Sequence, residues 1–436
     1  MKIIGAISLT IILSIALIPA AHAQFNVDGQ IVQRAEYRHG FGKLIEENEE
    51  PAAFIAHRAR LNVQYELESF KFYVSVQDVR TWGNTPQVKL TDPYLSLHEA
   101  WAETFLSDNF SIKLGRQELN YDNFRFLGNL DWALQGRAHD FALLKYEKGA
   151  LKFHAGGGYN QDNQSLNGNF FSTPNQYKVA HFLRYENIAG KFNFSLLFWN
   201  NGLQYSEVDN AGEIIKTGIH YRQTFGLPSL KYQLGNTGFA GFYYHQVGKD
   251  IQGRDVKAYD ASAQISQNFP IDTTQGSNFR LTLGIELLTG TDPVDNAAEN
   301  NSFSPLYGTN HAHNGYMDMF YVGGRHENSV GLRDMFLRMR YDINPKLFLS
   351  LNIHSFNSFT PYSENEDEHL GYETDLALGY LLNRSVSLQA GYSHFFQSDQ
   401  LENLQNVQNP AGRQNWGYLM VIYRPTLKNR FIGLLF

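Results

Sequence analysis

The sequence of 436 residues contains no cysteine, which excludes a disulfide framework and a thiolate metal site. Charged residues make up only 18% of the chain, and the formal net charge is −7. Because nucleic-acid binding shows as a basic surplus, we expect no nucleic-acid partner. Beyond the first residues, no apolar run approaches the roughly 20 residues of a membrane-spanning helix. The chain is nevertheless 43% apolar, with 32 Phe and 25 Tyr, which excludes a disordered protein.

Residues 1–23 have the pattern of a secretory signal peptide. Lys2 precedes an apolar stretch over 3–17, and Ala21-His22-Ala23 forms a cleavage signature before Gln24. A short anchoring helix is the alternative, but the apolar stretch is short for a membrane span. We therefore expect export through the secretory pathway and a mature chain of residues 24–436.

Alternation of apolar and polar residues recurs along the mature chain, as over 58–65, 192–198, 279–287, 347–353 and 386–392. Such segments are half-buried strands, and several of their apolar faces end in aromatic residues, as in the girdles of membrane barrels. Short turns alternate with longer loops near 38–53, 82–95, 118–137, 161–176, 201–217, 290–332, 358–370 and 398–412. A soluble sandwich has no reason to obey that rule, whereas an outer-membrane barrel does.

The pattern predicts an all-β fold, a transmembrane antiparallel up-and-down β-barrel of about 18 strands with short periplasmic turns and long extracellular loops. Either 414–423 or 431–436 is the closing strand. An even strand number favours the first and leaves 425–436 as a C-terminal tail beyond the periplasmic end. We expect the barrel to lie in the outer membrane, in contact with its lipid, after insertion by the barrel-assembly machinery.

One block of the chain, residues 115–140, carries a more specific motif than the strand pattern. It contains Gly115-Arg116-Gln117, Tyr121-Asp122, Arg125, Asp131-Trp132, Arg137 and Asp140. This block resembles the signature of the alginate-export outer-membrane porin family, and the stretch 307–318 resembles a second block of its Bacteroidetes branch. The resemblance implies a monomeric barrel of about 18 strands. It also implies an Arg-lined lumen that passes an anionic uronate polysaccharide, and it implies no catalysis and no cofactor.

Arginine suits that solute because its guanidinium grips a carboxylate with two parallel hydrogen bonds. Strand parity assigns six arginines to the lumen: Arg58, Arg60, Arg184, Arg280, Arg338 and Arg340. Three more flank or lie in the 118–137 loop, which is long enough to fold inward: Arg116, Arg125 and Arg137. Strict parity would turn Arg116 toward lipid, so we expect a bulge at Gly115 or a position at the rim.

The same arginines have an alternative, purely structural role, because large barrels carry interior ion pairs that brace the lumen. Asp122, Asp131 and Asp140 are close enough in sequence to pair with them, and Gly115, Gln117 and Trp132 belong to the same motif. Parity also turns acidic residues inward, which argues against strong anion selectivity: Glu36, Glu99, Glu103, Asp260, Glu286, Glu373 and Asp375.

Other chemistry is weakly indicated. His311, His313 and the pair His326-Glu327 have a spacing compatible with a metal, but such polar loops are more often solvated, and we predict no metal. No nucleophile motif of the G-x-S-x-G type occurs, so we predict no enzyme. The alternatives are a general or small-anion porin of the same fold, a barrel enzyme acting on lipid or glycan, and a secreted soluble protein that binds glycans.

Overall fold

The computed structural model describes residues 24–171, 173–292, 299–320, 326–361, 368–425 and 431–434. The predicted signal peptide, 1–23, lies outside these residues. No helix in the described part of the chain is long and apolar enough to cross a membrane.

Strands dominate the described chain, with one short α-helix, α2 (Asp399–Gln405), and one 3-10 turn, η1 (Asn310–Ala312). The strands are β1 (Gln24–His39), β2 (Ala52–Leu67), β3 (Phe70–Thr81), β4 (Leu95–Phe105), β5 (Phe110–Gln117), β6 (His139–Lys148), β7 (Leu151–Tyr159), β8 (Val179–Ala189), β9 (Phe192–Val208), β10 (Ile214–Leu234), β11 (Thr237–Lys249), β12 (Asp255–Asp272), β13 (Ser277–Leu288), β14 (Glu299–Asn300), β15 (Leu332–Asn344), β16 (Leu347–Asn357), β17 (His369–Leu381), β18 (Val386–Gln397) and β19 (Gln414–Tyr423).

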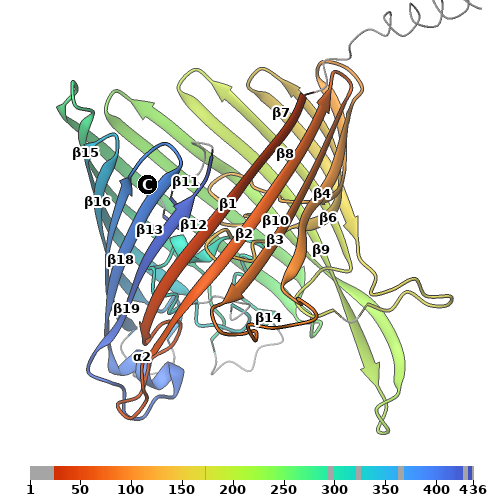
Figure 1. The fold of residues 1–436 in the computed structure, drawn as a ribbon. Helices are drawn as coiled ribbons and strands as arrows, with labels where there is room; N and C mark the ends of the chain where they lie inside the picture. Colours follow the sequence, from red (N-terminus) through yellow and green to blue (C-terminus); the bar gives the residue numbers. More distant parts are fainter. Residues whose placement is uncertain are drawn as a thin grey trace, which may run out of the picture.

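These strands form one closed sheet (Figure 1). Each strand of the wall pairs antiparallel with its neighbour in sequence, and β19 pairs with β1 from Ile31↔Tyr423 to His39↔Asn415. The two-residue β14 pairs parallel with β12 and stands outside this order, so the wall has 18 strands among the described residues. The predicted barrel is confirmed, and β19 is its closing strand. Of the alternative segment 431–436, residues 431–434 form no strand, and 435–436 lie outside the described residues.

Short turns lie at one end of the barrel and long connections at the other (Figure 1). One predicted loop, 201–217, is instead mostly strand, because β9 and β10 continue as a hairpin beyond the barrel. Cross-strand contacts support this extension: the rings of Tyr205 and His220 stack 4.1 Å apart, and Gln204 Nε2 donates to the carbonyl of Gly218. Because this hairpin is mostly polar in composition, its strands do not show the alternation of apolar and polar residues by which the other strands are recognised in the sequence.

The outer face of the wall carries exposed apolar side chains, among them Leu61, Leu114, Leu283 and Leu376. Exposed aromatic residues lie near the short turns: Phe72, Phe110, Phe153, Phe192, Phe269 and Tyr341. The inner face is polar and buried, as at Ser75, Gln77, Asn201, Thr224, Gln246 and Ser393. Apolar outside and polar inside is the pattern that lipid requires of a barrel.

Candidate functional site

Three segments of the described chain enter the lumen. We call 118–138, between β5 and β6, the constriction loop, and 299–320, between β13 and β15, the plug loop. The third is the tail segment 431–434, after β19. Their side chains are almost fully buried at Phe126, Met317 and Ile432. The length of the constriction loop predicts its inward course, whereas nothing in the sequence predicts the inward course of the tail segment.

Arg125 joins the constriction loop to both the wall and the plug loop. Its Nε lies 3.1 Å from Asp260 Oδ2 and 2.7 Å from Glu286 Oε1, on β12 and β13. Its Nη1 and Nη2 donate to the side-chain oxygens of Asn310 and Asn314 at 3.1 and 2.9 Å. The side chain of Arg125 is fully buried, so it braces the lumen and does not face a passing solute.

Trp132 is the central aromatic contact of the filled lumen. Its ring stacks on His311 of the plug loop at 4.1 Å and lies 4.0 Å from the guanidinium of Arg34 on β1. On β19, Trp416 meets it edge-on at 5.5 Å. Gly433 lies so close that a Cβ there would be 2.2 Å from the Trp132 ring. One indole therefore contacts the wall, the plug loop and the tail segment.

The tail segment is held by paired hydrogen bonds. Gln389 Nε2 donates to the carbonyl of Ile432 at 2.8 Å, and the Ile432 amide donates to Gln389 Oε1 at 3.0 Å. The rings of Phe431 and Phe348 meet edge-on at 4.9 Å. Residues 431–434 thus fold back into the barrel instead of extending beyond it, which corrects the predicted external tail. The driving force is burial of apolar side chains that would otherwise face water.

Asp131 anchors the constriction loop to the arginines of the wall. Arg58 Nη2 lies 2.8 Å from Asp131 Oδ1, and Arg424 Nη2 lies 3.6 Å from Oδ2. Arg58 also donates to the carbonyl of Leu134 at 3.0 Å. Burial raises the pKa of Asp131, but the charges of Arg58, Arg424 and Arg60 outweigh it and hold the pKa below its ordinary value.

A lowered pKa has a defined consequence for the Asp131→Asn variant. A carboxyl whose pKa is lower in the folded than in the unfolded state stabilises the fold fully above the unfolded value, about 3.9. This contribution is lost as the pH falls through the folded-state pKa. We expect Asp131→Asn to unfold at lower urea concentration than the parent at pH 7, with a difference that shrinks below about pH 4. A difference that is equal at pH 7 and pH 3 would contradict this assignment.

Arg184 and Asp122 form a second link between wall and loop. Arg184 Nη2 lies 2.9 Å from Asp122 Oδ1 and 2.5 Å from Glu186 Oε2. Ser195 donates to the same Asp122 oxygen at 2.5 Å. Asp122 has a φ of 55°, a left-handed conformation that aspartate tolerates better than most residues. These contacts make Arg184 a bracing residue as well.

Two further predicted arginines contact neutral groups. Arg60 Nε and Nη2 donate to Gln77 Oε1 at 3.0 and 2.7 Å. Arg137 Nη1 donates to the carbonyl of Gly308 in the plug loop at 2.9 Å, and burial lowers its pKa to about 10. Gln117, from the same motif, donates to the carbonyl of Phe141 at 2.9 Å and is buried. The motif residues therefore hold the constriction loop in place.

The prediction that Arg116 lines the lumen is wrong. Strand β5 pairs with β4 without a register shift, so no bulge occurs at Gly115, and Arg116 faces outward beside the last strand residue, Gln117. There its Nη1 lies 3.0 Å from Asp140 Oδ2, and both side chains are exposed. The rim position expected from parity is correct, because a charge costs less at the membrane edge than at mid-depth. Gly115 itself has a φ of 120°, and a Cβ would lie 2.3 Å from the carbonyl of Ala100.

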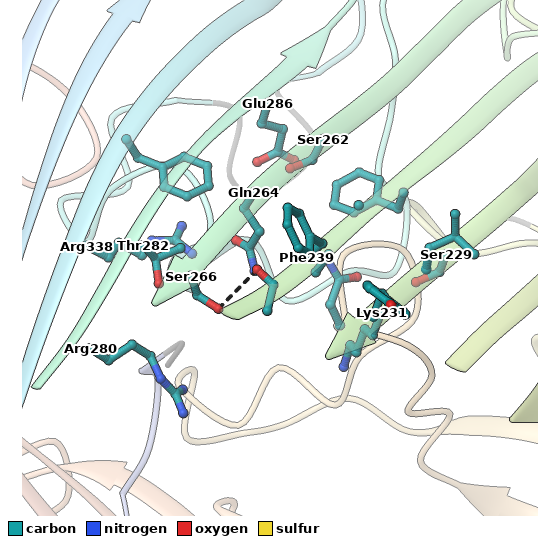
Figure 2. Close-up of a pocket in the computed structure, with 18 of the residues that line it drawn as sticks. Ser229, Lys231, Phe239, Ser262, Gln264, Ser266, Arg280, Thr282, Glu286 and Arg338 are labelled. Atoms are coloured by element: carbon teal, nitrogen blue, oxygen red, sulfur yellow. Dashed lines mark hydrogen bonds between the residues drawn. The ribbon is translucent and has the colours of Figure 1, made fainter. Parts of the chain in front are cut away.

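A cavity of about 640 Å³ lies on the short-turn side of the constriction loop, and we call it the vestibule. Asp122, Asn123 and Phe124 of the constriction loop and His313 of the plug loop line its inner end. Figure 2 shows Arg280 and Arg338 on one side and Lys231 on the other. Lys231 was not predicted as a site residue, although it lies beside a short turn and on the lumenal face of β10.

The vestibule cations differ from the bracing arginines in their partners. Arg280 Nε donates to Asn268 Oδ1 at 2.8 Å, and Arg338 Nη2 donates to the carbonyl of His313 at 3.2 Å. Within the described residues, neither they nor Lys231 forms an ion pair with a carboxylate. Arg340 also lines the vestibule, but its guanidinium is paired with Asp342 at 2.7 Å. Three cationic side chains thus face the cavity, which Glu286 also lines, without an ion pair in the described part of the chain.

The histidines considered as metal ligands have other partners. His311 lies 3.1 Å from Asp318 and stacks on Trp132. His313 is buried, and burial together with the charges of Arg125 and Arg338 holds its pKa well below the ordinary value, so its ring is neutral at pH 7. The structure therefore gives these two side chains packing roles in the plug loop.

Comparison with known families supports the resemblance suggested by the motif. Residues 24–187 match the family described as alginate export. This segment, which is less than half of the chain, is similar to the alginate export family. The match includes the whole 115–140 motif and confirms the resemblance. The block at 307–318 lies outside the matched range, so membership of the Bacteroidetes branch stays a prediction.

Solved structures from Pseudomonas aeruginosa share the architecture of this barrel. OccK9 (OpdG) is 14% identical with a TM-score of 0.59, covering 92% of this chain and 98% of that chain. The outer membrane protein OpdK is 13% identical with a TM-score of 0.58 and the same coverage. A structure of OpdK with vanillate is 12% identical with a TM-score of 0.57, again over 92% and 98%. Identities this low show the fold alone. No curated protein matches the chain.

The alginate-export match and the porin fold together place the chain in the outer membrane, as predicted. They support an outer-membrane channel, and neither the family nor these neighbours is enzymatic.

Proposed function

We propose that this channel passes an anionic polysaccharide or oligosaccharide, of the polyuronate class, by passive diffusion. The observation that supports this solute is the vestibule, where Lys231, Arg280 and Arg338 face a cavity of about 640 Å³ and form no ion pair among the described residues. A polyuronate carries one carboxylate per sugar, and the two guanidinium groups suit bidentate contacts with carboxylates. The channel functions as a monomer inserted by the barrel-assembly machinery.

In this proposal, the lumenal arginines fall into two groups, one that holds the constriction loop and one that attracts the solute. Arg58, Arg125 and Arg184 are buried in ion pairs that hold the constriction loop, so they shape the path. The vestibule cations attract the solute. Several weak sites in a row allow a charged chain to enter and also to leave, which a single tight site would prevent. Passage beyond the vestibule requires the constriction loop or the plug loop to shift.

The test is the triple variant Lys231→Ala/Arg280→Ala/Arg338→Ala in planar bilayers. We expect its reversal potential under a salt gradient to shift toward cation preference, because three unpaired positive charges leave the vestibule. We also expect the oligouronate concentration for half-block to rise at least about tenfold, the equivalent of about 1.4 kcal/mol. Arg116→Ala is the matched control, since Arg116 is an outward-facing rim residue paired with Asp140.

Each outcome has a defined meaning. Unchanged selectivity and unchanged block in the triple variant would refute the vestibule as the anion site. A shifted reversal potential without oligouronate block in the parent protein would instead support a small-anion porin of the same fold.

A further inference from the structure

A β-bulge on β4 turns two consecutive side chains into the lumen. Ser75 of β3 pairs with Glu99, but the next residue, Val76, pairs with Leu97, so His98 is an extra residue in β4. In a regular strand, neighbouring side chains point to opposite faces, so only one of His98 and Glu99 would face inward. Here His98 is 4% exposed, and Glu99 faces inward beside it. Bulges commonly re-aim side chains next to functional sites.

Glu118, the first residue of the constriction loop, completes a cluster with this pair. His98 Nε2 lies 2.8 Å from Glu118 Oε1, and the Glu118 amide donates to Glu99 Oε2 at 2.9 Å. One nitrogen and two carboxylate oxygens of these three residues all lie within 4.8 Å of one another. A zinc ion bonds such ligands at about 2.0–2.2 Å, so the three ligand atoms need to rearrange around it by on the order of half an ångström.

The charge of the cluster is incompletely balanced. Arg60 reaches Glu118 Oε1 only at 3.9 Å, because its shorter bonds go to Gln77. Lys113 stands 3.7 Å over the ring of Trp101, and no ion pair joins it to Glu99 in the described chain. Two largely buried carboxylates that approach each other without a cation between them repel, and a bound cation removes this cost.

We propose that His98, Glu99 and Glu118 bind one divalent transition-metal ion of the zinc class at the base of the constriction loop. A set of one imidazole and two carboxylates suits such an ion and leaves a fourth position for water. The Glu118 side chain is 18% exposed, which gives solvent access to the cluster. The ion joins the constriction loop to β4 and restrains the segment that has to move for passage.

Isothermal titration of the detergent-solubilised, chelator-treated protein with zinc chloride tests this proposal. We expect one ion per chain at this site with micromolar affinity, and at least about a tenfold loss in both His98→Ala and Glu118→Gln. Cobalt(II) substitution gives a second readout, because a tetrahedral site has a strong visible absorption that both variants lose. His154→Ala is the matched control: His154 also contacts a glutamate, Glu147 at 3.1 Å, but belongs to no such triad within the residues that the structure describes.

Failure of the parent protein to bind zinc at about 1 mM would overturn the proposal. Equal affinity in the parent and Glu118→Gln would do the same, and Glu99→Gln replaces any variant that does not fold. The reversal potential of the chelator-treated channel is measured without zinc. The zinc site and the proposed solute are therefore tested separately.

Discussion

Replacement of Arg125 by alanine is expected to raise the single-channel conductance several-fold and to destabilise the lumenal segments. The guanidinium is fully buried and holds Asp260 and Glu286 of the wall together with Asn310 and Asn314 of the plug loop. Removal of one partner of a buried ion pair costs about 3–5 kcal/mol, because the remaining charges stay buried without compensation. Hydration of the two carboxylates lowers this free-energy cost the most, and water reaches them only when both lumenal loops separate from the wall.

Planar-bilayer recording of Arg125→Ala measures the conductance, and amide hydrogen exchange over 118–138 and 299–320 measures the opening of the loops. The variant Arg125→Met/Asp260→Asn/Glu286→Gln removes the ion pairs without leaving buried charges, so we expect it to retain most of the protection. Arg116→Ala controls for the loss of an arginine at the exposed rim. Parent-like conductance together with parent-like exchange in Arg125→Ala would show that the loops do not depend on this residue.

Trp132→Ala is expected to have the second-largest effect. Truncation of a buried tryptophan costs about 3–5 kcal/mol, since the cavity that remains is only partly refilled. The indole contacts Arg34, His311, Trp416 and Gly433, so its loss affects the wall, the plug loop and the tail segment together. We expect faster amide exchange at 310–320 and 431–434, and longer open times of the channel.

Trp82→Ala provides the comparison for this variant, because Trp82 is 59% exposed and its removal leaves no cavity. We expect Trp82→Ala to keep the exchange pattern of the parent. If the two tryptophan variants exchange equally fast over 431–434, the tail segment is held without Trp132. The paired bonds between Gln389 and Ile432 would then be its main restraint.

Local patterns were enough to predict the wall of the barrel. Strand alternation depends on the opposite faces of successive side chains, and short turns are visible in the sequence because they join adjacent strands. The same reasoning placed Arg58 and Arg184 inside and suggested aspartates of the 115–140 motif as partners of lumenal arginines without assigning pairs. The structure pairs Arg58 with Asp131 and Arg184 with Asp122. It failed at 201–217, where the strands leave the membrane and lose the apolar half of the pattern.

The alternation of residues along a strand could not predict which arginines brace the lumen and which face the vestibule. Arg125, Arg280 and Arg338 have similar local sequence contexts, yet Arg125 meets residues from 135 to 189 positions away in sequence, whereas Arg280 and Arg338 face a cavity. Contacts over such separations depend on how the loops fold back, and no local period encodes them. His98 is a comparable case, because a single inserted residue reverses the face that alternation assigns.

The sequence by itself determined a closed, exported barrel with a polar interior, because the alternation of faces and the rhythm of turns are local properties that lipid enforces on every strand. The family motif at 115–140 is equally local. Only the tertiary structure decided what fills the lumen: which arginines are neutralised, that the tail segment folds back on Trp132, and that a bulge brings His98 and Glu99 to Glu118. These outcomes depend on charge pairing and packing between residues distant in the chain, where burial makes each unpaired group costly.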